Sequence, residues 1–297
     1  MRNILNEITS ESVSIPTSAG TVRGHVLEPA DAQTVAAAVV LHPATAVPER
    51  LYRGFAEFLA GEGFAVVTYD YRGTGTSGVP RENRGIRMRD WMSVDVPAVA
   101  QWTQDRFPNA PQLAVGHSIG GHALALGYGS SELRGFVTIA SHAGVTRAIP
   151  THAERLRVAF VLRVLGPVTA RLLGYVPGRR IGLGEDMPGA AMLEWSRWSR
   201  LPRYFFDDPT MDAEARAAGV RTDVLAIGFS DDLWATPEQI DAITGHLADA
   251  EVERRTIDPA SVGVEKIGHM GFFRRANRDR LWPQVSEWLR RRIEPAS

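Results

Sequence analysis

The sequence contains no cysteine, a single lysine and no long apolar run. The absence of cysteine excludes disulfide bonds, thiolate metal sites and a cysteine nucleophile, and it fits a reducing compartment. No apolar stretch approaches the roughly 18 residues of a membrane span. Residues 1–7 reach polar side chains too early for a secretory signal. We therefore expect a cytoplasmic protein without a membrane partner.

Charge of neither sign dominates the chain. Its 33 basic and 34 acidic residues nearly cancel, and every basic residue except Lys266 is arginine. Because no basic stripe with interleaved aromatic residues is present, we do not expect nucleic acid as a partner. The 297 residues allow one large domain or two ordinary ones. The sequence leaves the oligomeric state open, a homodimer included.

Short apolar runs alternate with helical patterns in the first half of the chain. A hairpin is expected first, with strands near residues 13–15 and 21–27 around a turn at 17–20. Further strands are expected at 36–41, 64–69, 113–115 and 136–140, with helices at 50–60, at 89–106 and from residue 119. This alternation predicts a mostly parallel sheet with right-handed crossovers.

The alternation stops between about residues 150 and 219. There we expect no strand, only helical stretches such as 156–165 and 192–200. The rhythm then resumes with strands at 224–229 and 252–257 and a last helix at 281–293. Between these strands, Thr236 as N-cap, Pro237 in the first turn and Gln239 at N3 begin another helix. The predicted organisation is an α/β core at 1–149 and 220–297, interrupted by a helical cap at 150–219.

A serine stands where a strand gives way to a helix. The sequence Gly-His-Ser-Ile-Gly spans residues 116–120, directly after the apolar strand. This is the setting of a nucleophile elbow, in which the central residue is strained and its neighbours two positions away must be small. The motif alone is weak, and an idle serine in a glycine-rich turn is the simpler alternative. The flanking strand and helix favour Ser118 as the nucleophile.

Together with other motifs, this turn resembles the α/β-hydrolase superfamily. The resemblance runs from about residue 20 to the C-terminus. It is carried by His-Pro at 42–43, Asp-Tyr-Arg-Gly-Thr-Gly-Thr-Ser at 70–77, the motif at 116–120 and Gly-His-Met-Gly-Phe-Phe at 268–273. Residues 194–204 further resemble a group of poorly characterised bacterial hydrolases. The resemblance implies an α/β-hydrolase fold and serine-hydrolase chemistry.

A serine hydroxyl needs a base, and the base needs an orienting acid. In this superfamily the chain order is serine, acid, histidine. His269 lies in a glycine-flanked loop before the last helix and is the expected base, whereas His246 falls in a predicted amphipathic helix as a surface residue. The acid should follow the strand at 224–229, which leaves Asp231 and Asp232. Resemblance favours Asp232, five residues before Pro237, while counting from the strand end favours Asp231.

Two backbone N–H groups aimed at the developing oxyanion each contribute about 3 kcal/mol. One should belong to Ile119, which begins the helix after Ser118, and resemblance implies Ala44 as the other. His42, His117 and His142 end core strands, where open α/β sheets place their sites, and are expected to contact substrate or to support the oxyanion loop. A three-histidine metal site is the less favoured alternative, and we expect neither metal nor cofactor.

The cap segment is rich in large apolar side chains. We expect it to cover Ser118 and to line an apolar pocket for a small-molecule substrate, with Trp195 and Trp198 as substrate contacts. The alternative is that most of these residues pack the cap against the core. The set comprises Phe160, Leu162, Leu165, Leu172, Leu173, Tyr175, Trp195, Trp198, Tyr204, Phe205 and Phe206.

These features favour a serine hydrolase that cleaves carboxylic esters through an acyl-enzyme on Ser118. An acyltransferase would use the same residues with a bound acceptor in place of water. A non-catalytic ligand-binding protein on a hydrolase scaffold is the alternative of another class, since fold does not fix function. Labelling with a fluorophosphonate separates this last alternative from the enzymes.

Overall fold

The computed structural model describes residues 7–31 and 35–294, so most of the N-terminal segment judged too polar for a secretory signal lies outside the described residues. An eight-stranded sheet forms the centre of the molecule, in the order β1-β2-β4-β3-β5-β6-β9-β10. The strand β2 pairs antiparallel with β1 and β4, and every other pair is parallel. The predicted mostly parallel α/β sheet is confirmed.

The strands lie where the apolar runs predict them. Their bounds are β1 Ile8–Thr17, β2 Gly20–Pro29, β3 Ala37–His42, β4 Phe64–Asp70, β5 Gln112–His117, β6 Leu133–Ile139, β9 Val224–Phe229 and β10 Val252–Ile257. Every residue of β3, β4 and β9 is buried, because helices cover both faces of these central strands. The edge strand β10 is only partly buried and carries charged residues.

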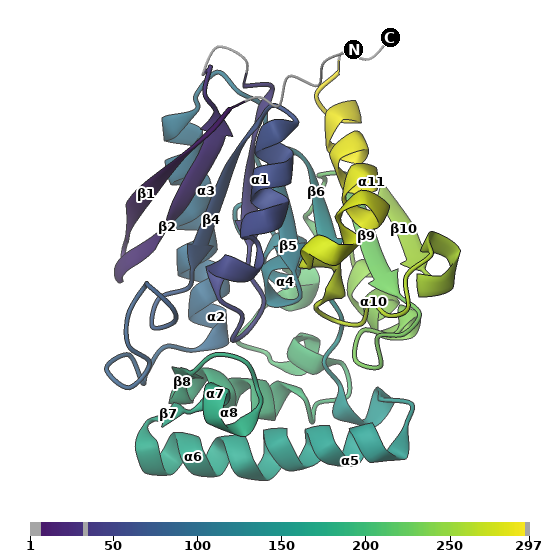
Figure 1. Cartoon of the computed structure of the whole chain (residues 1–297). Helices are drawn as coiled ribbons and strands as arrows, with labels where there is room; N and C mark the ends of the chain where they lie inside the picture. The colour runs from purple at the N-terminus through teal and green to yellow at the C-terminus, as the bar shows by residue number, and fades with distance from the viewer. Residues whose placement is uncertain (1–6, 32–34, 295–297) are drawn as a thin grey trace.

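Helices cover the two faces of the sheet (Figure 1). α1 (Arg53–Gly61) and α11 (Arg278–Arg291) pack together on one face, and α3 (Val96–Arg106), α4 (Ile119–Ala125) and α10 (Pro237–Thr244) lie on the other. Thr236 caps α10 as predicted, since its hydroxyl accepts the N–H of Gln239. The shorter helical turns of the core are η2 Glu49–Leu51, α2 Met88–Asp90, η3 Trp91–Asp95, η4 Thr146–Ala148, η7 Pro259–Val262, η8 Gly271–Phe273 and η9 Arg275–Asn277.

Between β6 and β9 the chain leaves the sheet, and its helices lie across the end of the molecule below β5 and α4 in Figure 1. These elements are α5 His152–Phe160, η5 Val161–Leu165, α6 Gly166–Leu173, α7 Gly178–Ile181, α8 Gly189–Trp198, η6 Tyr204–Asp207 and α9 Ala213–Ala218. The expectation of no strand here is wrong, because β7 (Tyr175–Val176) and β8 (Met187–Pro188) form a small antiparallel pair. Strands of only two residues are too short to show an alternating pattern in the sequence.

Helix α5 also extends further than the sequence predicts. It continues through the π-helical turn η5 into α6, although Gly166 and Pro167 suggest a break. A proline ring collides with the carbonyl four residues earlier, and a π turn moves that carbonyl aside. The same arrangement recurs where the π-helical turn η3 precedes Pro97 in α3. A wide turn before each proline thus lets both helices run on.

The outer face of α5 and α6 carries a row of exposed apolar side chains. Phe160 is 56% exposed and Leu172 is 78% exposed, and Leu173 is also exposed. These three residues therefore do not line a pocket, contrary to expectation. In the described part of the chain, no helix combines the length and the hydropathy needed to cross a bilayer.

Candidate active site

Ser118 occupies a strained turn between β5 and α4. Its backbone has φ of 51° and ψ of −112°, a conformation that residues other than glycine rarely adopt. A Cβ on Gly116 would lie 2.4 Å from the nitrogen of Gly121, and one on Gly120 would lie 2.3 Å from the carbonyl oxygen of His42. The two glycines are therefore required by close backbone approach, as the motif predicts.

The loop before η8 brings His269 against the loop that follows β9. Nδ1 of His269 lies 2.7 Å from Oδ2 of Asp232, and the other carboxylate oxygen accepts the N–H groups of Trp234 and Ala235. Burial opposes ionisation of Asp232, but the imidazole of His269 outweighs it and holds the carboxyl pKa well below its usual range. The structure thus sets Asp232, and not Asp231, on the imidazole.

Asp231 serves the same loop in another way. Its carboxylate accepts the backbone N–H groups of Ile267 and Gly268, at 2.9 Å for the shorter bond to each. These contacts fix the chain immediately before His269. Asp231 is therefore a loop anchor in this structure, and the sequence alternative that made it the orienting acid is not supported by its contacts.

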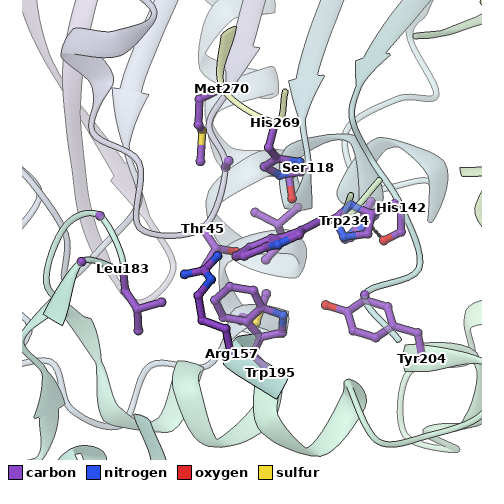
Figure 2. Close-up of a pocket in the computed structure, with 17 residues that line it drawn as sticks. Thr45, Ser118, His142, Arg157, Leu183, Trp195, Tyr204, Trp234, His269 and Met270 are labelled. Carbon is purple, nitrogen blue, oxygen red and sulfur yellow. Dashed lines mark hydrogen bonds between the residues drawn. The ribbon is translucent and has the colours of Figure 1, made fainter. Parts of the chain in front are cut away.

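Ser118 and His269 line one cavity of about 300 Å³ (Figure 2). The cavity lies between the carboxyl ends of the strands and the segment 150–219, which contributes residues to its far wall. Figure 2 shows the Ser118 oxygen directed into this space, beside His269. Other residues that line the cavity include Ala44, Thr45, Ile119, His122, His142, Gly144, Arg157, Leu183, Trp195, Tyr204 and Trp234.

Only some of the residues predicted to contact substrate line this cavity. His142 and Trp195 line it, whereas Trp198 does not. The indole of Trp198 is 1% exposed and donates its N–H to Asp208 inside the segment 150–219. The prediction for Trp198 is therefore wrong, because its buried ring bonds to Asp208 and packs against Arg89 of α2.

His42 and His117 are likewise buried away from the cavity lining. Nδ1 of His42 hydrogen-bonds the Tyr69 hydroxyl. His117 donates from Nε2 to the carbonyl oxygen of His269, 3.0 Å away, and supports the base loop from below. Neither contacts the cavity as a substrate residue would, because both side chains are buried and bond to core groups.

The amide of Ala44 is engaged by a side chain. It donates to the Tyr52 hydroxyl at 2.8 Å, and this hydroxyl donates in turn to Nδ1 of His117 at 2.9 Å. The prediction that the Ala44 amide faces an oxyanion is therefore wrong in this structure, because Tyr52 from the turn before α1 lies beneath the loop. The Ile119 amide has no such partner among the described residues, and Thr45 follows Ala44 along the cavity wall.

Burial keeps the histidines around the cavity neutral. It lowers the pKa of His42, His117 and His122 to about 3 and that of His142 to about 4. The three-histidine metal site considered from the sequence is not formed. Within residues 7–31 and 35–294, no group of three or more histidine, aspartate or glutamate side chains has the geometry to hold a metal ion.

Two charged residues hold the glycine-rich loop after β4 in place. Arg72 pairs with the fully buried Asp95 in η3. Asp70 accepts the N–H and the hydroxyl of Thr76 within the loop. His246 lies beyond the end of α10, where its ring stacks on Phe206 at 3.8 Å between centroids.

Sequence reasoning missed a group of residues beside His269. The ring of Trp234 lies 5.7 Å from that of His269, between centroids, and its indole N–H donates to Glu154 of α5 at 2.6 Å. Glu154 also pairs with Arg157. The only signal for Trp234 in the sequence was its position, two residues after the candidate acid Asp232. The contact with α5 joins segments 80 residues apart, and no local pattern announces it.

Comparison with known proteins gives one family and many similar folds. The family model described as serine aminopeptidase, S33, matches residues 33–246. No curated protein that was compared matches the chain. A thermostable carboxyl esterase from Bacillus coagulans has a TM-score of 0.65 at 16% identity, over 96% of this chain and 99% of that chain.

Two archaeal structures are similar in the same way. An esterase from Pyrococcus furiosus has a TM-score of 0.58 at 16% identity, over 97% of this chain and 94% of that chain. A monoacylglycerol lipase from Paleococcus ferrophilus has a TM-score of 0.56 at 17% identity, over 96% of this chain and 99% of that chain. At these identities the likeness concerns the fold.

Proposed function

The chain belongs to the serine aminopeptidase S33 family of α/β hydrolases, and from this premise we propose that it cleaves carboxylic esters of small, largely apolar substrates through an acyl-enzyme on Ser118. The membership makes the chain a serine hydrolase. The choice of ester substrates draws on the esterases and the lipase with the same fold. The observation that carries the proposal is that Ser118 and His269 line one cavity, with Asp232 behind the imidazole.

In this mechanism the Ser118 hydroxyl attacks the ester carbonyl carbon while Nε2 of His269 takes its proton. Asp232 holds the imidazole by its Nδ1–H and stabilises the imidazolium that forms. The imidazolium then protonates the departing alcohol. A water molecule, deprotonated by His269, attacks the acyl-enzyme and releases the acid and the free serine.

The oxyanion of each tetrahedral intermediate needs two donors. We assign them to the amides of Ile119 and Thr45, since the Ala44 amide is engaged by Tyr52. The N-terminus of α4 adds a favourable dipole at the first of these. A peptidase that takes a free amino terminus would need an acidic group in the cavity, and none of the described lining residues is acidic. Ester cleavage is therefore preferred over aminopeptidase activity.

We also propose that residues 150–219 act as a cap that shapes the substrate cavity. Arg157, Leu183, Trp195 and Tyr204 of this segment line it together with Ser118. A cover that excludes water from the cavity would strengthen the electrostatic interactions inside. It would equally suit an acyltransferase, in which a bound acceptor replaces water, and product analysis with competing alcohols distinguishes the two reactions.

Fluorophosphonate labelling tests the nucleophile, and ester turnover tests the substrate class. Wild-type protein should gain one phosphonyl group on the peptide that contains Ser118 and should hydrolyse p-nitrophenyl butyrate. The Ser118→Ala variant should show neither reaction while keeping the wild-type circular dichroism spectrum. Labelling at another residue, or equal turnover by the variant, would overturn the proposal.

A further inference from the structure

Two polar groups of the cavity take no part in the proposed mechanism and have no hydrogen-bond partner among the described residues. They belong to His142, in the loop after β6, and Tyr204, at the start of η6 (Figure 2). The two residues are 7% and 2% exposed, and both line the cavity of Ser118. Their polar atoms are therefore available to hydrogen-bond a group placed in the cavity.

The hydrogen bonds of His142 fix the role of its free nitrogen. Nδ1 lies 3.0 Å from the carbonyl oxygen of Ala140, which can only accept, so Nδ1 carries the proton. Burial lowers the pKa of His142 to about 4, so the ring is neutral near pH 7. Nε2 therefore has a lone pair and no hydrogen. His142 presents a hydrogen-bond acceptor to the cavity.

Tyr204 has the opposite role. Burial raises the pKa of its hydroxyl, so the group keeps its proton and can donate. The hydroxyl has no partner among the described residues, and Figure 2 shows it directed toward the cavity. The residue has φ of 56°, a strained conformation for a bulky side chain. Strain of this kind persists where the surrounding structure requires it, often at ligand sites.

The two groups belong to one wall of the cavity. The His122 ring lies 6.5 Å from the His142 ring and 5.8 Å from the Tyr204 ring, between centroids. Gly144 allows the tyrosine to approach, since a Cβ there would lie 3.0 Å from Cε2 of the ring. His122 itself donates from Nε2 to the His142 carbonyl, which holds the loop in place. An acceptor and a donor thus face the same enclosed space.

We propose that His142 and Tyr204 form a subsite for a free hydroxyl group of the substrate, which donates to Nε2 of His142 and accepts from the Tyr204 hydroxyl. The inference rests on the proposed ester cleavage and deepens it, since it makes the substrate a hydroxylated ester. The indoles of Trp195 and Trp234 add apolar surface to the same cavity. A site with unpaired buried donors and acceptors discriminates strongly against an analogue that lacks the matching hydroxyl.

Paired substrates test this subsite in the wild-type protein. One pair is p-nitrophenyl 3-hydroxybutyrate and p-nitrophenyl butyrate, with the hydroxyl on the acyl side. The other is 2-hydroxyethyl butyrate and propyl butyrate, with the hydroxyl on the alcohol side. The hydroxylated ester should have a kcat/KM about tenfold higher in at least one pair, corrected for its rate with hydroxide. Hydrolysis of both esters without preference in either pair would overturn the subsite and leave ester cleavage standing, whereas no hydrolysis of any ester would overturn ester cleavage itself.

Variants then assign the preference to the two residues. Tyr204→Phe and His142→Leu should each reduce the ratio of the two kcat/KM values about five- to tenfold, and His142→Gln, which retains an acceptor, should restore part of it. Tyr128→Phe is the matched control, since Tyr128 packs against Arg216 outside the cavity lining, and its ratio should equal that of the wild type. If the Tyr204→Phe variant and the His142→Leu variant each kept the wild-type preference for the hydroxylated ester, other groups would recognise the hydroxyl. That result would overturn the assignment.

Discussion

The hydroxyl of Tyr52 accepts a hydrogen bond from the backbone N–H of Ala44 at 2.8 Å. The same hydroxyl donates to Nδ1 of His117, whose Nε2–H reaches the carbonyl oxygen of His269. One buried chain of hydrogen bonds thus joins the loop after β3 to the loop that carries His269. We infer that it holds the oxyanion loop and the base in register.

Replacement of Tyr52 by phenylalanine should weaken both loops. The Tyr52→Phe variant leaves the Ala44 amide and His117 Nδ1 without a partner, so the free energy of unfolding should fall by about 2 kcal/mol. A displaced oxyanion loop should lower kcat about tenfold. Urea denaturation and ester kinetics measure the two effects, with Tyr128→Phe as control. Wild-type values of both would show that the chain of bonds has no such role.

Adjacent aspartates should separate orientation of the base from anchoring of its loop. Asp232→Asn removes the carboxylate from the His269 imidazole and should lower kcat about a thousandfold or more, with little change in KM. Asp231→Asn weakens two bonds to the backbone before His269 and should lower kcat only about tenfold. Steady-state kinetics of both variants test the assignment, and a larger effect at Asp231 would reverse it.

The buried histidines should make the protein sensitive to acid. The folded pKa is about 3 for His42, His117 and His122 and about 4 for His142, all below the ordinary 6.5. Below pH 6.5 the unfolded chain binds protons that the folded protein does not. As far as these histidines contribute, the free energy of unfolding is therefore highest above this pH. It should fall toward pH 4 by about 1.4 kcal/mol per pH unit for each histidine.

Two carboxyls act in the opposite direction. Burial raises the pKa of Asp95 to about 6, which offsets one proton of this difference between about pH 6 and 4, and burial also raises the pKa of Glu194. Urea denaturation from pH 7.5 to 5 measures the net slope. His142→Gln should remove about one proton from this slope. A stability that is flat over this range would contradict the prediction.

Two tryptophans of the proposed cap should differ in what they control. Trp195→Ala enlarges the cavity and should raise kcat/KM for p-nitrophenyl hexanoate relative to the acetate about fivefold. Trp198→Phe loses the bond to Asp208 and should cost about 2 kcal/mol of stability, with the substrate ratio within about twofold of the wild type. An unchanged ratio in Trp195→Ala would contradict a cap that shapes the substrate pocket.

Local sequence patterns were sufficient to predict the parallel sheet, the turn at Ser118 and the N-terminal cap of α10. Each of these depends on neighbours along the chain: apolar runs make buried strands, glycines at 116 and 120 permit the tight turn, and Thr236 reaches the amide of Gln239. Such constraints act over a few residues, and a local pattern is sufficient to show them.

Which side chains contact one another could not be predicted from such local patterns. Asp231 and Asp232 are neighbours, but the backbone turns one toward the Ile267 amide and the other toward the His269 imidazole. The Ala44 amide is taken by Tyr52, and Trp195 enters the cavity while Trp198 faces Asp208. These outcomes depend on how segments distant in the sequence pack together. The direction of each side chain is set by all the residues that surround it in the fold.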